Sequence, residues 1–140
     1  MIAKLLVAWC LMSASVAIHA LGLAAAVRWL GRHPMAFESF WPTTWLFVRL
    51  AGLVIFLHLI EIGVWGAIYA WRGAIADLQS ALYFSAVTYT TTGYGDIVLP
   101  PEWRLVGGIE ALTGILMCGW STGFFFAVVG RGFSRSEVRP

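Results

Sequence analysis

Three apolar stretches, each long enough to cross a lipid bilayer, constrain the fold of this chain more than any other feature. They cover about residues 5–30, 44–71 and 105–130, and a membrane-spanning helix needs about 20 mostly apolar residues. Of the 140 residues, 60% are hydrophobic and only 11% are charged, whereas about 25% of a soluble domain is charged. The sequence therefore predicts an all-α membrane protein with three transmembrane helices.

A shorter apolar segment lies between the second and third stretches, at about residues 77–90. It is too short to span a bilayer and predicts a re-entrant pore helix instead. The sequence TTTGYGD follows it, at residues 90–96. Irregular backbone at membrane depth is tolerated only where it is buried in protein or lines a water-filled cavity.

Two glycines in this segment alternate with bulkier residues, since Gly93 and Gly95 are separated by Tyr94. Glycine takes left-handed dihedrals at little cost. If alternate residues take such dihedrals, successive carbonyls can point to the same side. The spacing therefore predicts an extended stretch whose carbonyl groups face one axis.

The motif TTxGYGD, placed between a short apolar segment and a membrane helix, resembles the potassium-channel pore family. Its order of outer helix, pore helix, filter and inner helix would cover residues 44–130 as a pore domain. Residues 1–43 would then form an additional transmembrane helix with a cytoplasmic connector, and residues 131–140 a cytoplasmic tail. The resemblance implies a C4 homotetramer in the lipid bilayer that conducts K⁺.

The resemblance also implies roles for individual residues of the selectivity filter. Backbone carbonyls of Thr91, Thr92, Gly93 and Tyr94, with the Thr91 hydroxyl, would bind K⁺, and Gly95 would complete the filter. The family most often has valine where this chain has Thr92, and the added hydroxyl needs a hydrogen-bond partner. Potassium selectivity and weak monovalent cation selectivity therefore both remain open.

Residues outside the filter are expected to support it. By resemblance, Asp96 and the Tyr94 ring brace the filter from behind, and Tyr83 and Phe84 occupy the aromatic positions of the pore helix. Glu110 lies at the depth of the pore helix and is expected to bond to the pore helix or to the back of the filter, for instance to Thr92 or Tyr83, or else to face an aqueous crevice. Gly114 is either a gating hinge of the inner helix or a site of close helix packing.

Three ionisable residues lie near the middle of the apolar stretches: His19, His58 and Glu61. His58 and Glu61 are three residues apart and therefore share a helix face. Since ionisable side chains in a membrane need partners, we expect this pair to meet Ser15 and His19 of the first helix. The cluster is either a pH-sensitive gate or a polar staple that holds the first helix to the pore.

Basic residues predict the orientation of the chain, because they favour the cytoplasmic side. Six lie in or beside the first connector and the tail, and three lie on the other side. The N-terminus is therefore expected outside the cell membrane and the C-terminus in the cytoplasm. The six are Arg28, Arg32, Arg49, Arg131, Arg135 and Arg139, and the three are Lys4, Arg72 and Arg104.

Other classes of function have little support in the sequence. No HExxH motif or carboxylate cluster indicates an enzyme, and no cofactor is expected beyond permeant K⁺. The net charge of +2 does not indicate a nucleic-acid partner. A non-conducting assembly or regulatory subunit is the remaining alternative. We expect the first helix to be retained, because it is longer than a signal peptide, and both cysteines to be buried as small hydrophobes.

Overall fold

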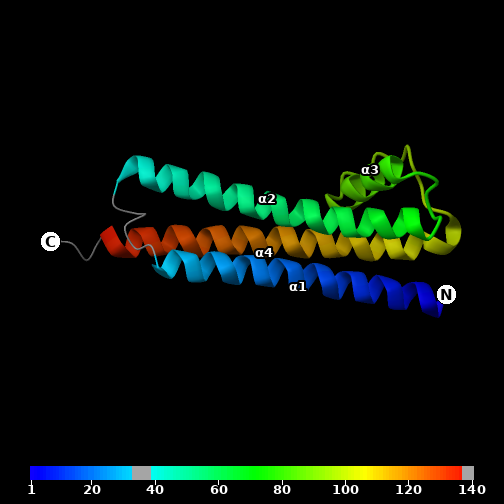
Figure 1. The fold of residues 1–140 in the computed structure, drawn as a ribbon, viewed down its shortest axis with the longest axis horizontal. Helices are drawn as coiled ribbons and strands as arrows, with labels where there is room; N and C mark the ends of the chain where they lie inside the picture. Colours follow the sequence, from blue (N-terminus) through cyan, green and yellow to red (C-terminus); the bar gives the residue numbers. More distant parts are fainter. Residues whose placement is uncertain (33–38, 137–140) are drawn as a thin grey trace.

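The computed structural model of the protein describes residues 1–32 and 39–136, with backbone only for residues 131–136. It contains four α-helices and one short 3₁₀ helix, and no strand among these residues (Figure 1). In chain order they are α1 (Ile2–Arg32), α2 (Phe40–Trp71), α3 (Leu78–Tyr89), η2 (Pro101–Trp103) and α4 (Arg104–Ser136).

Three of these helices are long and apolar enough to cross a membrane, as the sequence predicted. The candidate spans are Ile2–Arg32, Phe40–Trp71 and Pro101–Gly130, with mean hydropathies of 1.9, 2.0 and 1.7. The helices extend further than expected at several ends. The connector expected between the first two stretches, residues 31–43, is helical at residues 31–32 and 40–43. Residues 33–38 are not described. Pro42 is compatible with this because it lies in the first turn of α2, where backbone N–H groups lack helical partners.

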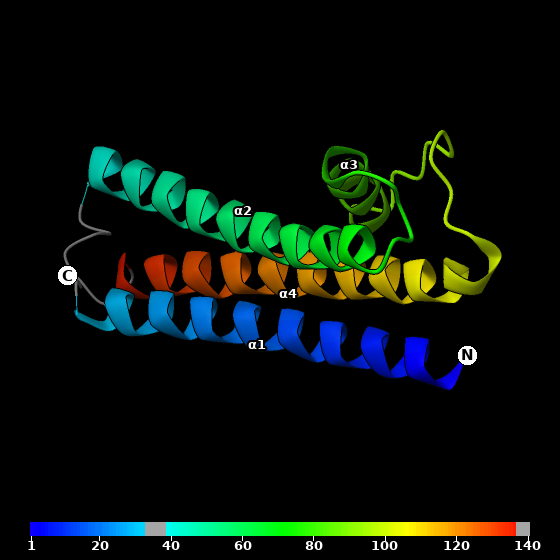
Figure 2. The same ribbon diagram turned by 45° about the vertical axis from the view of Figure 1, so that its right-hand side comes forward.

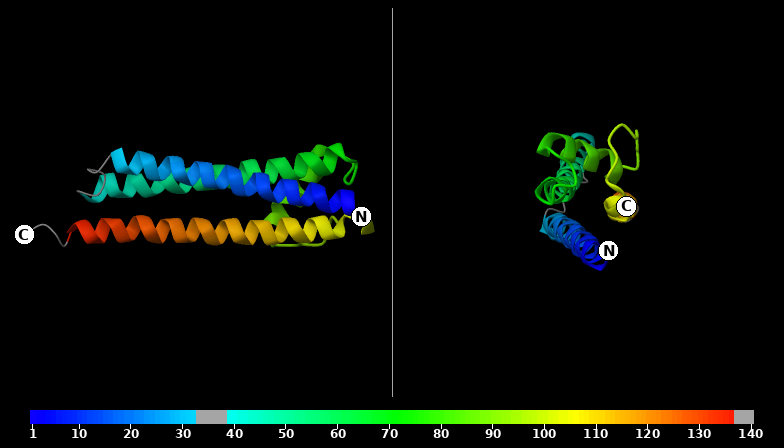
Figure 3. Two further views of the ribbon diagram at one scale, coloured as in Figure 1. Left: turned by 90° about the horizontal axis from the view of Figure 1, so that it is seen from below. Right: turned by 90° about the vertical axis from the view of Figure 1, so that its right-hand side faces the viewer.

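The long helices lie side by side, and α2 runs antiparallel to α1 and α4 (Figures 1 and 2). α1 packs against both α2 and α4, and α3 packs against both α2 and α4. α3 is confined to one end of the bundle (Figures 1 and 2), on the side away from α1 (Figure 3, right). The N-terminus lies at that end, and the α1–α2 connection lies at the other (Figure 1).

Two apolar clusters form the core, and polar residues separate them. One cluster includes Leu11, Trp65, Tyr69 and Met117. The other lies towards the α1–α2 connection and consists of Leu23, Ala26, Leu30, Leu46, Leu50, Val54, Phe124 and Val128. In each long helix, buried polar residues lie in sequence between the members of the two clusters: Ser15 and His19 in α1, Glu61 in α2, and Ser121 in α4.

One prediction about burial was wrong, since Cys10 and Cys118 are both free and exposed on the chain. Trp103, in contrast, is buried. Its ring contacts Tyr69 edge-on at 6.2 Å, and Lys4 Nζ lies 4.9 Å from its centroid. An apolar neighbourhood does not predict burial in a membrane protein, because the lipid-facing surface is apolar as well.

Gly114 allows α4 to approach the end of α3. A Cβ atom on this residue would lie 1.9 Å from the backbone oxygen of Tyr89, well inside van der Waals contact. α4 continues as one helix through this position. The geometry supports the packing role for Gly114, while its role as a hinge stays a prediction.

Replacing Gly114 with alanine should therefore lower thermal stability, because the added methyl group would push α3 away from α4. Overpacking of this kind costs roughly 1–3 kcal/mol. The measurement is thermal unfolding of the purified protein in detergent. Gly52→Ala is the matched control, since a Cβ at Gly52 meets nothing within 4 Å. Equal stability of the two variants would contradict the packing role.

Candidate functional site

The short helix α3 begins and ends with defined hydrogen bonds. Asp77 caps its N-terminus by accepting a hydrogen bond from the backbone N–H of Ser80 at 2.8 Å. This bond lowers the pKa of Asp77 below its ordinary value. At the other end, the Gly93 N–H donates to the Val87 carbonyl at 3.2 Å. α3 thus fixes the start of residues 90–96, which we call the glycine segment.

Alternate residues of the glycine segment have positive φ. The values are 59° at Thr91, 57° at Gly93 and 77° at Gly95. The left-handed dihedrals predicted for the two glycines are therefore confirmed. Thr91 was not anticipated, because a β-branched residue rarely adopts positive φ. It is the one non-glycine residue with positive φ in the described part of the chain.

The hydroxyl of Thr92 has a partner. Thr90 Oγ1 donates to the Ala86 carbonyl at 2.7 Å and lies 2.9 Å from Thr92 Oγ1. Because the hydroxyl hydrogen of Thr90 is directed to the Ala86 carbonyl, the Thr92 hydroxyl donates to Thr90 Oγ1. The hydroxyl that distinguishes this segment from the usual valine is thus bonded towards α3.

Asp96 is tied to α3 by a hydrogen bond from the Tyr83 hydroxyl to Asp96 Oδ2 at 2.7 Å. This bond lowers the pKa of Asp96. It therefore contributes stability above the ordinary pKa of the carboxyl, and this contribution is lost as the pH falls through the lowered value. Phe84 does not join this contact, since its ring lies 5.4 Å from that of Tyr69 in an edge-on arrangement.

Replacing Tyr83 with phenylalanine should free the end of the glycine segment and return the Asp96 pKa towards its ordinary value. We expect amide hydrogen exchange at residues 93–98 to become severalfold faster at neutral pH, because the loop loses its bond to α3. Exchange within α1 should stay unchanged and serves as the internal control. Unchanged exchange at residues 93–98 would show that the bond does not hold the segment.

Glu110 is fully buried and bonded to α3, as predicted, but its partner there is Ser85 rather than Tyr83, and it does not bond to Thr92. It accepts hydrogen bonds from the Ser85 hydroxyl and, at 2.8 Å, from the Tyr69 hydroxyl. Thr92 and Tyr83 bond elsewhere. Tyr83 and Ser85 are separated by about 200° around the helix axis, so only one of them can face α4. Counting along the sequence placed Glu110 at the correct depth but did not give the rotation of α3.

Replacing Glu110 with leucine should destabilise the protein by about 1–3 kcal/mol, because the buried hydroxyls of Tyr69 and Ser85 lose an acceptor. Glu110→Gln is the matched control, since its amide oxygen still accepts a hydrogen bond. We expect thermal unfolding in detergent to show a clear loss for Glu110→Leu and a smaller one for Glu110→Gln. Leucine tolerated as well as glutamine would contradict this role.

The polar cluster joins all four α-helices. It comprises His19 of α1, His58 and Glu61 of α2, Tyr89 of α3 and Ser121 of α4. His19 Nδ1 lies 2.9 Å from Glu61 Oε1, and the Tyr89 hydroxyl donates to Glu61 Oε2. His58 Nδ1 lies 3.1 Å from the Tyr89 hydroxyl. Ser121 Oγ lies 2.9 Å from His19 Nε2 and 3.2 Å from His58 Nε2.

The expectation that His58 and Glu61 meet Ser15 and His19 is only partly correct. His19 does meet Glu61, but Ser15 does not contribute, because its Oγ accepts a hydrogen bond from Trp65 Nε1 at 3.1 Å. Tyr89 and Ser121 were missed, and nothing in their spacing relates them to residues of α1 or α2. The cluster therefore reaches α3 and α4 rather than joining only α1 to α2. The gate and the staple both stay predictions.

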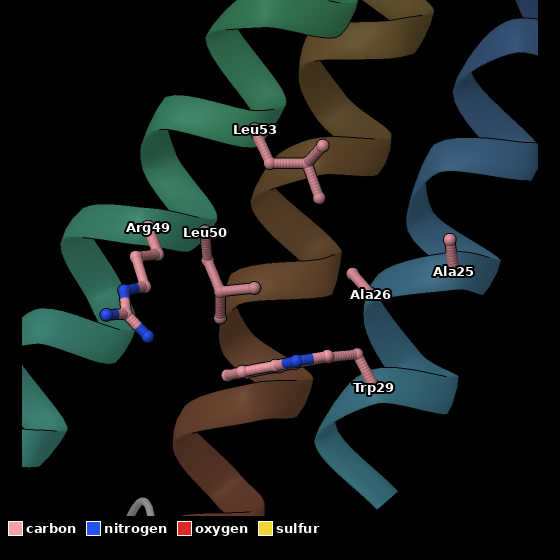
Figure 4. Close-up of a pocket in the computed structure, with 6 residues that line it drawn as sticks. All are labelled: Ala25, Ala26, Trp29, Arg49, Leu50 and Leu53. Atoms are coloured by element: carbon pink, nitrogen blue, oxygen red, sulfur yellow. The ribbon is translucent and has the colours of Figure 1, made fainter. Parts of the chain in front are cut away.

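A groove of about 410 Å³ lies between α1 and α2, away from the glycine segment. Figure 4 shows Trp29 extending from α1 towards the residues of α2. Arg49 is the only charged residue among its lining side chains, which are Ala25, Ala26, Trp29, Arg49, Leu50 and Leu53. The groove is separate from both the glycine segment and the polar cluster.

These features define a class: a multi-pass membrane protein in which a short helix and a glycine-containing segment lie between two long apolar helices. A family model described as "Ion channel" matches residues 43–131. The match covers most of the chain, including α3 and the glycine segment, and the chain therefore belongs to this ion channel family. α1 lies entirely outside the match. Searches of curated proteins and of solved structures find no significant match.

Proposed function

We propose that the protein is a subunit of a homotetrameric potassium-selective channel and that the glycine segment is its selectivity filter. The observation that carries this proposal is the sequence TTTGYG with positive φ at every second residue, Thr91, Gly93 and Gly95, in a chain of an ion channel family. Rings of backbone carbonyls that replace the hydration shell of K⁺ are the established basis of such filters. The carbonyls of Thr91, Thr92, Gly93 and Tyr94 would supply these rings.

The position of α3 supports a cation site. The glycine segment follows the C-terminal end of α3, and the C-terminus of a helix carries partial negative charge that favours cations. Four copies of α3 around one axis would direct four such ends to the same ions.

The exposure of the glycine segment supports an oligomer. Residues 90–96 are all exposed in the single chain, and the Tyr94 side chain is 71% exposed. One chain supplies only one side of a carbonyl ring, and a closed cyclic tetramer supplies the others. We infer that Tyr94 packs against a neighbouring copy.

The orientation of the chain follows from its basic residues. The N-terminus lies at the same end of the bundle as α3 (Figure 1), and most basic residues of the described part of the chain belong to the opposite end. We therefore propose that the N-terminus and the glycine segment face the outside and that the C-terminus is cytoplasmic.

A weakly selective cation channel is the second candidate, because Thr92 replaces the usual valine. The bond from Thr92 to Thr90 favours strict selectivity, since it turns the Thr92 hydroxyl towards α3 and gives it the hydrogen-bond partner that it needs. A non-conducting subunit is less supported, because such a role does not require alternating positive φ.

The test is the reversal potential of the purified protein in planar bilayers under opposing K⁺ and Na⁺ gradients. We expect the reversal potential to follow K⁺. Gly93→Ala should abolish conduction, because a Cβ at φ 57° costs roughly 1–2 kcal/mol in each subunit. Thr92→Val is the matched control and should conduct with equal or higher K⁺ selectivity.

The possible outcomes separate the candidate functions. A reversal potential insensitive to the choice of K⁺ or Na⁺ would favour the weakly selective channel. Absence of current from a well-folded wild type would favour the non-conducting subunit. Normal conduction by Gly93→Ala would show that the filter lies elsewhere.

A further inference from the structure

We propose that His19, His58, Glu61 and Tyr89 form a binding site for a divalent transition metal ion of the zinc class, buried between the helices. One ligand atom from each of His19, His58 and Glu61 lies within 4.8 Å of the others. The Tyr89 hydroxyl contacts both His58 and Glu61. This inference does not depend on whether the protein conducts ions.

The spacing of the four side chains suits a tetrahedral ion. Zinc binds nitrogen and oxygen ligands at about 2.0–2.1 Å, so neighbouring ligand atoms of a tetrahedral site lie about 3.3 Å apart. Here His19 Nδ1 lies 2.9 Å from Glu61 Oε1, and His58 Nδ1 lies 3.8 Å from Glu61 Oε2. The His58 Nδ1 atom is also 3.1 Å from the Tyr89 oxygen. These separations bracket the tetrahedral value, so small shifts would accommodate the ion.

Ser121 provides the outer hydrogen bond that metal-binding histidines require. Its hydroxyl donates to the Met117 carbonyl at 3.0 Å, which uses its only hydrogen. The oxygen is then an acceptor for the Nε2–H groups of His19 and His58, at 2.9 and 3.2 Å. A histidine that binds a metal through one nitrogen donates the N–H of the other to such a partner.

This arrangement turns the other ring nitrogens of both histidines towards Glu61. If both Nε2 atoms carry hydrogen and the rings are neutral, both Nδ1 atoms present lone pairs to the Glu61 carboxylate and the Tyr89 oxygen. Several acceptors facing each other in a buried site need a cation among them. Either a metal ion or additional protons would meet this need, and the ligand spacing favours the metal.

The donor set identifies the chemical class of the ion. Two imidazoles and one carboxylate are typical zinc ligands, and the Tyr89 oxygen would complete the four. Calcium and magnesium prefer sites built from oxygen ligands. Glu61 and His19 are fully buried, whereas the His58 side chain is 17% exposed, so an ion would enter past His58. The bound ion would join α1 and α2 to the last residue of α3.

The experiment is a cobalt titration of the metal-stripped, full-length and tag-free protein in detergent. Tetrahedral Co²⁺ absorbs strongly in the visible range, and Zn²⁺ should displace it. We expect one ion per chain. Replacing His58 with glutamine should weaken binding at least 100-fold, and Ser121→Ala should weaken it by about 10-fold to 100-fold. His33→Gln is the matched control, because it removes the only other histidine, and it should bind like the wild type.

Three results would overturn the proposal. The first is a wild type without stoichiometric tetrahedral Co²⁺ absorption, which decides the matter even if His58→Gln fails to fold. The second is equal binding by the wild type and a folded His58→Gln variant. The third is a metal-free wild type that binds no ion and becomes more thermostable as the pH falls through the range where histidine titrates. That result would identify protons as the cations of the polar cluster.

Discussion

Buried polar groups need hydrogen-bond partners within the protein, and hydrogen bonds to carboxyl groups determine the position of α3. Three hydroxyl groups of this short helix each donate to a different carboxyl group. The pairs are Tyr83 with Asp96, Ser85 with Glu110 and Tyr89 with Glu61. They point in different directions and engage α2, α4 and the glycine segment. α3 is therefore fixed in both depth and rotation.

The sequence predicted the elements of this fold because each depends on local pattern. Runs of apolar residues of a given length predicted three long helices and one short one, and the glycine spacing predicted left-handed dihedrals at Gly93 and Gly95. The pairing of helix faces was not predictable in the same way. Lipid and protein core are both apolar, so apolar residues occur on every side of these helices. Only polar residues can indicate which faces of two helices pack together. Even they can give a wrong pairing, since Ser15 bonds to Trp65 rather than to Glu61.

The positive φ of Thr91 shows a second limit of sequence reasoning. Intrinsic preference disfavours this conformation for a β-branched residue, so it must be imposed by the surroundings. The Thr91 N–H donates to the Thr88 carbonyl at 2.9 Å, and the Gly93 N–H donates to the Val87 carbonyl. These bonds to the last turn of α3 hold the residues on both sides of Thr92. The conformation is therefore a consequence of how α3 ends, which the motif alone does not reveal.

Such strained backbone persists only where the surrounding structure holds it in place, and in the single chain this support comes from one side. The glycine segment is hydrogen-bonded to α3 by Thr90, Gly93 and Asp96, whereas Tyr94 is largely exposed. The carboxyl groups that fix α3 also lie within the chain. The chain thus holds its own glycine segment from behind. In the proposed tetramer, neighbouring copies and bound cations would stabilise the open side. Because one chain covers only one side of the glycine segment, this arrangement supports a functional unit of several chains.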